Sequence, residues 1–169
     1  MQTNFFVKSH GLGNDYIVLD SELITFELTE TTIKRICDIH YGIGSDGILL
    51  KVPSQKADFG IRIFNPDASE AEKSGNGLRI FCKYLFDYGF VANTVFTVET
   101  ISDVVTAEII EKQAGKAKRI KVDMGKAEFV ADKIPVLTNK QECIGYEIEI
   151  LDSKFKINCL SVGNPHCVI

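Results

Sequence analysis

The chain has 169 residues, of which 45% are hydrophobic and 25% are charged, as is usual for a globular protein of one domain or one large lobe. Its net charge of −4 and the lack of a long basic run argue against a nucleic-acid-binding surface. No apolar stretch approaches the roughly 18 residues that a transmembrane helix needs, and the first residues do not resemble a signal peptide, so we expect a cytoplasmic protein.

The chain begins with two predicted strands that are joined by a polar loop. Phe5–Ser9 and Tyr16–Leu19 are short apolar runs of the kind that form strands. The segment His10–Asp15 between them holds two glycines, an asparagine and an aspartate. Such residues are standard turn formers, so the loop taken alone favours a hairpin over a binding site.

A helix is predicted at Glu30–His40, because apolar residues recur there at helical spacing and Thr29 is a suitable N-cap. The next segment, Gly42–Gly47, matches the G-x-G-x-x-G pattern of dinucleotide-binding proteins. That function requires a strand before the pattern and a helix after it, whereas here a helix ends before it and the predicted strand Ile48–Val52 follows. We therefore reject a dinucleotide site and interpret the glycines as a helix end that leads into a turn.

A second helix is predicted at Asn76–Tyr88, after the predicted strand Phe59–Phe64 and a polar loop that reaches Ser74. This helix is apolar on nearly every side, which is typical of a helix that is buried all round, and Gly89 ends it. Its amino terminus offers free N–H groups and a partial positive charge that suit a carboxylate or a phosphate. Capping by Ser74 explains the serine equally well. Glycines beside the cap are unfavourable in a helix, however, and suggest that something approaches the backbone closely.

The rest of the chain adds the predicted strands Val95–Glu99, Val104–Ile110, Arg119–Met124, Tyr146–Ile150 and Lys156–Val162. We expect a turn and a further strand in Gly163–Ile169, where His166 and Cys167 would point to opposite faces and would not pair. Because strands do not alternate with helices, the pattern predicts an α+β fold in which a curved, mostly antiparallel sheet wraps around a central buried helix.

The cysteines are spread along the chain without a C-x-x-C pair. Their odd number and irregular spacing fit neither a disulfide framework nor a zinc site, so we expect no metal and mostly buried, reduced thiols. They are Cys37, Cys82, Cys143, Cys159 and Cys167.

In combination, these segments resemble the diaminopimelate epimerase family. The signatures that carry the resemblance are HGLGNDY at 10–16, GIGSDG at 42–47, FNPDASEAEKSGNGLR at 64–79, VDMG at 122–125 and SVGNPHCVI at 161–169. Each signature is weak alone, but their order and gaps follow those of the family. The resemblance implies that residues 1–169 are the amino-terminal lobe of a two-lobe enzyme. In such an enzyme each lobe is a curved sheet around a helix, and the substrate lies between the lobes; the second lobe is absent from this chain.

The resemblance also implies an isomerase of lysine biosynthesis that interconverts LL- and meso-diaminopimelate without pyridoxal phosphate, a metal or another cofactor. Two cysteines, one from each lobe, face opposite sides of the α-carbon. One thiolate removes the proton, and the other thiol delivers one. The implied partners are a small amino-acid substrate and the missing carboxy-terminal lobe, with a homodimer as an open alternative; they include neither nucleic acid nor a membrane.

Carried over residue by residue, the resemblance assigns two kinds of substrate contact. The side chains of Asn14 and Asn65 would bind the distal amino-acid end of the substrate, and Asn164 would add a further polar contact. The backbone N–H groups of Gly75 and Asn76 would hold the reacting carboxylate. Donors fixed at a helix start can stabilise the charge of a developing carbanion without reorganising.

The catalytic position falls on Ser74, with His166 beside it to tune its ionisation. The family has cysteine there, and a serine hydroxyl is far less acidic than a thiol and needs an adjacent base. Cys82 lies two turns into the buried helix and is a poor replacement. Three explanations are open. The serine is engineered, or it is natural in an impaired or repurposed relative, or another group transfers the proton.

Gly47 is a second departure, because family members often carry glutamine at this position as a substrate contact. The two departures keep alternatives open beside an incomplete or impaired diaminopimelate epimerase. One alternative is a non-catalytic relative that still binds an amino acid, which both Ser74 and Gly47 favour. The other is a racemase for another amino acid in the same fold, which Gly47 favours.

Overall fold

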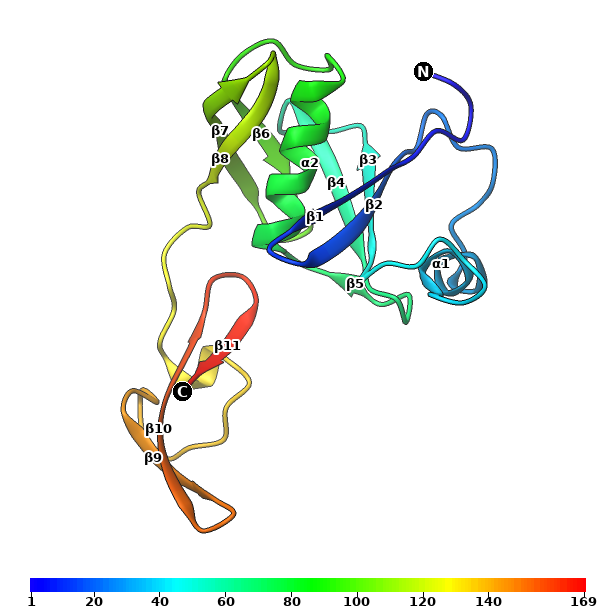
Figure 1. Ribbon diagram of the computed structural model, residues 1–169. Helices are drawn as coiled ribbons and strands as arrows, with labels where there is room; N and C mark the ends of the chain where they lie inside the picture. The colour runs from blue at the N-terminus through cyan, green and yellow to red at the C-terminus, as the bar shows by residue number, and fades with distance from the viewer. The chain divides into compact units, whose positions relative to one another are not determined.

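The computed structural model describes residues 1–169 and divides into two compact units, Met1–Asp123 and Met124–Ile169. The first, the amino-terminal unit, contains a mixed sheet and two helices, and the second, the carboxy-terminal unit, contains a small antiparallel sheet (Figure 1). The elements of the amino-terminal unit are β1 (Val7–Gly11), β2 (Asn14–Asp20), α1 (Glu30–Cys37), β3 (Ile48–Val52), β4 (Phe59–Phe64), β5 (Glu70–Ala71), α2 (Gly75–Asp87), β6 (Val95–Glu99), β7 (Val104–Gln113) and β8 (Lys116–Val122).

The sheet of the amino-terminal unit has the order β1-β2-β3-β4-β6-β7-β8, with β5 paired to β4. Only β2/β3 and β4/β6 are parallel pairs. Helix α2 packs against β1 and β2 near one end of the sheet and against β8 at the other, so the sheet curls around it (Figure 1). The predicted α+β fold with a curved, mostly antiparallel sheet around a central helix is therefore confirmed.

Helix α2 forms where the sequence predicts it because its two ends carry clear signals. The Ser74 side chain caps the first turn. At the other end Gly89 has a φ of 77°, and the N–H of Phe90 donates to the carbonyl of Leu85 at 2.9 Å, as in a helix that ends with a left-handed residue. No residue of α2 is fully exposed, and Phe81 is completely buried, which stabilises the fold by roughly 1.5–3 kcal/mol.

Strand β3 is covered on both faces along Ile48–Leu50, which explains the apolar run with which it begins. Ile48 and Leu50 belong to a core cluster that also contains Ile33 of α1. Leu49 points to the other face, where its side chain lies against Gly77 of α2. The central part of the sheet is thus fixed between the two helices.

The sequence predicts both helices and all of the longer strands, and it misses two short elements, β5 and the 3-10 helix η1 (Ala131–Lys133). Strand ends differ where turns are tight. Leu12 and Gly13, with φ values of 57° and 89°, form a two-residue hairpin turn, so β1 runs on to Gly11 instead of ending at Ser9. Similarly, β8 begins at Lys116, immediately after a two-residue turn.

Helix α1 begins as predicted, because the Thr29 hydroxyl accepts a hydrogen bond from the N–H of Thr32 at 3.2 Å. It ends at Cys37 and not at His40. The Asp38 carboxylate accepts hydrogen bonds from the N–H groups of His40 and Tyr41. These bonds fold the segment after Cys37 into a turn, so the helix does not continue. Neither α1 nor α2 has the length and apolar content that a membrane-spanning helix requires.

The carboxy-terminal unit is an antiparallel sheet of order β11-β10-β9. Its strands are β9 (Tyr146–Ile150), β10 (Ser153–Ser161) and β11 (Pro165–Val168). The turn and strand expected in Gly163–Ile169 are present as β11 and the bend before it. A small core gathers on one face of β10 and consists of Ile134, Cys143, Ile157 and Cys159.

Candidate active site

The amino terminus of α2 is a half-buried, capped helix start. Ser74 has extended backbone angles, and its hydroxyl accepts a hydrogen bond from the N–H of Gly77 at 3.1 Å. The N–H groups of Gly75 and Asn76 precede the first intrahelical hydrogen bond and have no backbone acceptor in the helix. Both residues are only partly buried, and N–H donors at a helix start suit an anion.

Gly77 is explained by close packing inside the protein, whereas the sequence suggested that a ligand approaches the backbone there. A Cβ atom at Gly77 would lie 3.0 Å from the Leu49 side chain and 3.2 Å from the Ser74 side chain. The close neighbour at this position is therefore the protein itself, and no ligand is needed to explain the glycine.

Asn14 and Asn76 lie together at this helix start. The amide nitrogen of Asn76 donates to the amide oxygen of Asn14 at 3.3 Å. The Asn76 amide oxygen in turn accepts a short hydrogen bond from the Arg79 guanidinium. Two residues that are 62 positions apart are thus brought to one place by the packing of α2 against β2.

Asp46 holds Asn14 from the other side, and sequence reasoning missed it. Its carboxylate accepts hydrogen bonds from the Asn14 amide at 2.9 Å and from the N–H of Asp15 at 3.0 Å. These bonds hold the pKa of the Asp46 carboxyl below its usual range. The sequence signal that could have indicated this role is the aspartate in the GIGSDG segment, since Asp side chains commonly accept hydrogen bonds from backbone N–H groups in turns.

Tyr16 is a second residue that sequence reasoning missed. Its hydroxyl lies 3.3 Å from the Ser74 hydroxyl, and the residue is 6% exposed. Within the amino-terminal unit, Ser74 is therefore hydrogen-bonded to a phenol and to a backbone N–H. The only sequence signal for this contact is the alternation in β2, which places Tyr16 and Val18 on the same face.

Lys73 anchors the segment that leads into Ser74. The side chain of this buried lysine makes an ion pair at 2.8 Å with Asp103, which lies in the turn between β6 and β7. Burial raises the pKa of the Asp103 carboxyl, but the ion pair with Lys73 and the hydrogen bonds from Thr100 and Ser102 outweigh burial and lower that pKa. The residue before the helix cap is thus fixed to the far half of the sheet.

Asn65 does not join the group around Asn14. Its side-chain amide donates to the Ser69 hydroxyl at 2.9 Å, and its backbone N–H donates to the Ser69 carbonyl at 2.8 Å. It makes no hydrogen bond with Asn14 or Asn76 in this structure. Its predicted role as a ligand of the distal substrate end stays a prediction.

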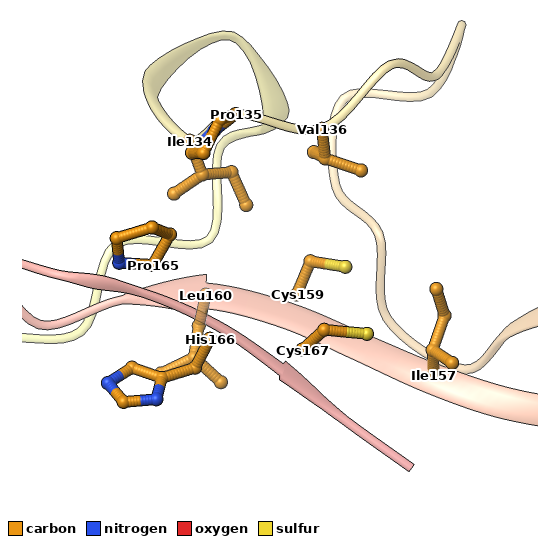
Figure 2. Close-up of a pocket in the computed structure, with 9 residues that line it drawn as sticks. All are labelled: Ile134, Pro135, Val136, Ile157, Cys159, Leu160, Pro165, His166 and Cys167. Carbon is orange, nitrogen blue, oxygen red and sulfur yellow. The ribbon is translucent and has the colours of Figure 1, made fainter. Parts of the chain in front are cut away.

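Asn164 and His166 belong to the carboxy-terminal unit. The His166 imidazole lies 3.1 Å from the Asn164 amide oxygen and makes no hydrogen bond with Cys167. Both His166 and Cys167 line a pocket of about 370 Å³ on the β10–β11 hairpin, and Figure 2 shows their side chains pointing in different directions. The predicted effect of His166 on Ser74 stays a prediction.

Two further observations bear on the chemistry of the site. Cys82 is completely buried in α2, and this burial raises the pKa of its thiol to about 12, so it cannot stand in for a thiolate at position 74. No group of three or more His, Cys, Asp and Glu side chains in the structure could hold a metal ion.

The diaminopimelate epimerase family model matches residues 6–130 of the chain. The chain is 49% identical over 165 residues to diaminopimelate epimerase 2 of Nostoc sp. (strain PCC 7120 / SAG 25.82 / UTEX 2576). This alignment covers 97% of the chain and 56% of the relative. The chain is also 45% identical over 163 residues to the diaminopimelate epimerase of Acetivibrio thermocellus, in an alignment that covers 96% of the chain and 58% of the relative. The chain thus spans just over half the length of these relatives.

Solved structures show the same fold at low sequence identity. A hydroxyproline epimerase from Agrobacterium vitis matches with a TM-score of 0.68 and 14% identity, over 96% of this chain and 50% of that one. A phenazine biosynthesis protein of the PhzF family from Bacillus anthracis matches with a TM-score of 0.56 and 19% identity, over 96% of this chain and 52% of that one. With the family model covering most of its length, the chain belongs to the diaminopimelate epimerase family.

Proposed function

We propose that this chain is the amino-terminal lobe of a cofactor-independent epimerase of lysine biosynthesis that interconverts LL- and meso-diaminopimelate, with impaired proton transfer at Ser74. The observation that carries the proposal is the half-buried start of α2. There the partly buried Gly75 and Asn76 would offer their N–H groups to a carboxylate, and the Asn76 side chain is hydrogen-bonded to Asn14. The rest of the protein would supply the second lobe and the opposing cysteine.

The chemistry requires a proton to leave a carbon atom that is only weakly acidic. Negative charge then develops on the α-carbon and spreads into the adjacent carboxylate. The N–H groups of Gly75 and Asn76 and the positive end of the α2 dipole would stabilise this charge where it appears. A closed cleft would exclude water and strengthen both effects.

Ser74 limits the rate in this proposal. Its hydroxyl accepts a hydrogen bond from the N–H of Gly77, and this bond would stabilise negative charge on the oxygen. The same hydroxyl is also hydrogen-bonded to the Tyr16 hydroxyl. Neither contact makes an alcohol as acidic as a thiol, so we expect slow proton removal on this face. A thiol at the same place would sit at a helix start, an environment that lowers a cysteine pKa towards neutrality.

The test is deuterium exchange at the α-carbon with the full-length protein. LL-diaminopimelate is incubated in deuterated buffer, and mass spectrometry follows deuterium incorporation while chiral chromatography follows the meso product. We expect slow exchange by the natural sequence and a rise of about 10²-fold or more in S74C, in line with the usual size of general acid–base effects. The control S153C places a thiol at an exposed position of β10, where the serine side chain makes no hydrogen bond, and it should leave the rate unchanged.

A second candidate, an amino-acid-binding relative without turnover, is favoured by Ser74 itself. Isothermal calorimetry separates the two functions. Diaminopimelate binding by both the natural sequence and S74C, with no exchange by either, would replace the epimerase proposal with the binding one.

A racemase for another amino acid is favoured by Gly47, where nothing extends toward a substrate. A Cβ atom at Gly47 would lie 2.4 Å from the Phe64 carbonyl oxygen and 2.9 Å from the Tyr16 ring, so this position is closed by the fold. A panel of amino acids in the same exchange assay decides. Faster exchange with another amino acid than with diaminopimelate would establish this alternative.

A further inference from the structure

Cys159 and Cys167 face each other across the β10–β11 hairpin. They are Cα partners in the antiparallel ladder. The N–H of Cys159 donates to the Cys143 carbonyl at 2.8 Å, and Ser161, two residues on, exchanges both of its backbone hydrogen bonds with Glu128. These residues of β10 therefore direct their polar groups away from β11, and Cys159 and Cys167 form a non-hydrogen-bonded pair.

That pairing brings the two side chains as close as a β-ladder allows. The Cα atoms of a non-hydrogen-bonded pair lie about 4.5 Å apart, with the side chains on the same face. A disulfide requires Cα atoms about 4.4 to 6.8 Å apart. In Figure 2 the sulfur atoms of Cys159 and Cys167 point in the same direction, on the side where the pocket lies. The hairpin can therefore take a disulfide without a change of register.

The thiols around Cys159 differ in their access to solvent. Cys143 and Cys159 are buried, whereas Cys167 is exposed. The thiols of Cys143 and Cys167 both lie close enough to Cys159 to affect its ionisation. Burial above all, and these two thiols in addition, raise the pKa of Cys159 to about 11. Cys159 is therefore a poor first nucleophile, and the exposed Cys167 is the thiol that a dissolved oxidant meets first.

We propose that Cys167 is a site of oxidation by hydroperoxides and that the oxidised residue forms a reversible disulfide with Cys159. The Cys167 thiolate attacks one peroxide oxygen, the O–O bond breaks, and the leaving hydroxide takes a proton to become water. Cys167 is then a sulfenic acid. The Cys159 sulfur attacks the Cys167 sulfur, the S–O bond breaks, and the hydroxide leaves as water with the Cys159 proton. Two thiols are oxidised to one disulfide, and one hydrogen peroxide is reduced to two waters.

The proposed oxidation does not use Ser74 or the start of α2. The disulfide would close the short hairpin that carries Asn164 and His166. It would leave Ser74 and the rest of the amino-terminal unit chemically unchanged. All five cysteines are free thiols in the structure, so the proposed bond is a modification of this fold.

The experiment uses full-length protein that is treated with hydrogen peroxide, quenched with catalase, denatured, alkylated with N-ethylmaleimide and digested with trypsin. Because trypsin cleaves after Lys140, Lys154 and Lys156, Cys143 lies in the peptide 141–154, whereas Cys159 and Cys167 share the peptide that begins at Ile157. We expect this last peptide to appear unalkylated and lighter by two hydrogen atoms. Dithiothreitol should restore alkylation at both positions.

Three variants sharpen the result. C167S should abolish the internal disulfide, and because position 167 is exposed, this variant should fold normally. C143S should retain the disulfide, as should C37S, which removes a buried thiol of the amino-terminal unit. A peroxide-induced link between the two peptides would assign the bond to Cys143 and overturn the proposal. Full alkylation of Cys159 and Cys167 after peroxide treatment would overturn it as well, and so would an oxidation product that persists in C167S.

Discussion

The hydroxyl groups of Tyr16 and Ser74 lie 3.3 Å apart, although 58 positions separate the residues in the sequence. In Y16F this contact is lost, while the Gly77 N–H still holds Ser74. We expect α-proton exchange to fall by about 10-fold or more, since a positioned proton-transfer partner typically contributes 10²–10⁴-fold. The dissociation constant for diaminopimelate should be unchanged.

The control for this prediction is Y84F, because the Tyr84 hydroxyl contacts the Met1 sulfur and not the start of α2. Equal exchange rates in Y16F, Y84F and the natural sequence would show that the Tyr16 hydroxyl takes no part in proton transfer.

Removal of the Ser74 hydroxyl should also weaken the fold. In S74A the N–H of Gly77 loses its acceptor, and we expect the free energy of unfolding to fall by about 1 kcal/mol. S74N, which retains a capping oxygen, should lose less. Urea unfolding measures both, and T29A is the matched control because Thr29 caps α1 in the same way. An S74A protein as stable as the natural one would rule out a stabilising cap.

A side chain at position 47 should disturb both the fold and Tyr16. A Cβ atom there meets the Phe64 carbonyl oxygen at 2.4 Å and the Tyr16 ring at 2.9 Å. We expect G47A and G47Q to lose about 1–3 kcal/mol of unfolding free energy, the usual size of an overpacking effect. At Gly13 a Cβ atom meets nothing, so G13A should lose only the ~1 kcal/mol of a left-handed residue. Unfolding curves of G47A and G13A that coincide would contradict the close approach at position 47.

The stability of the fold should depend on pH through Asp46. Hydrogen bonds from Asn14 and from the N–H of Asp15 lower the pKa of Asp46 in the folded state, below the value of about 3.9 of an unfolded chain. Asp46 therefore stabilises the fold above that pH, and its contribution is lost as the pH falls through the lower, folded pKa. The contribution is small, below about 1 kcal/mol, because Asp46 is exposed.

Urea unfolding at a series of pH values from neutral to strongly acidic checks this prediction. In D46N the loss of stability toward low pH should be shallower than in the natural sequence. D132N alters an exposed aspartate whose side chain accepts no hydrogen bond in the structure, and it should reproduce the natural profile. Superimposable profiles of D46N and the natural sequence would exclude the Asp46 contribution.

The sequence alone predicted the local structure well, because the signals for it are local. The cap at Ser74, the stop at Gly89 and the apolar run of α2 determine that helix without reference to the rest of the chain. The contacts of the candidate site were harder to predict. The bond between Asn14 and Asp46 joins residues that are 32 positions apart, and it depends on the parallel pairing of β2 and β3. No periodicity encodes that pairing.

Gly77 shows a related limit of sequence reasoning. A glycine near a helix start is compatible with a ligand that approaches the backbone, and also with a tight internal contact. Only the position of Leu49, on a strand that both helices cover, distinguishes the two explanations. Asn65 was assigned to the substrate because of its place in a family signature; in the structure its side-chain amide donates to Ser69 in its own loop, and the assignment stays a prediction.

The contact between Gly77 and Leu49 has a consequence for binding thermodynamics. It seats the first turn of α2 directly on the interior of the sheet, so the donors at Gly75 and Asn76 are held as firmly as the interior itself. If a carboxylate binds there as we propose, it would meet groups whose positions are already set. Little of its binding free energy is then lost to the ordering of protein atoms.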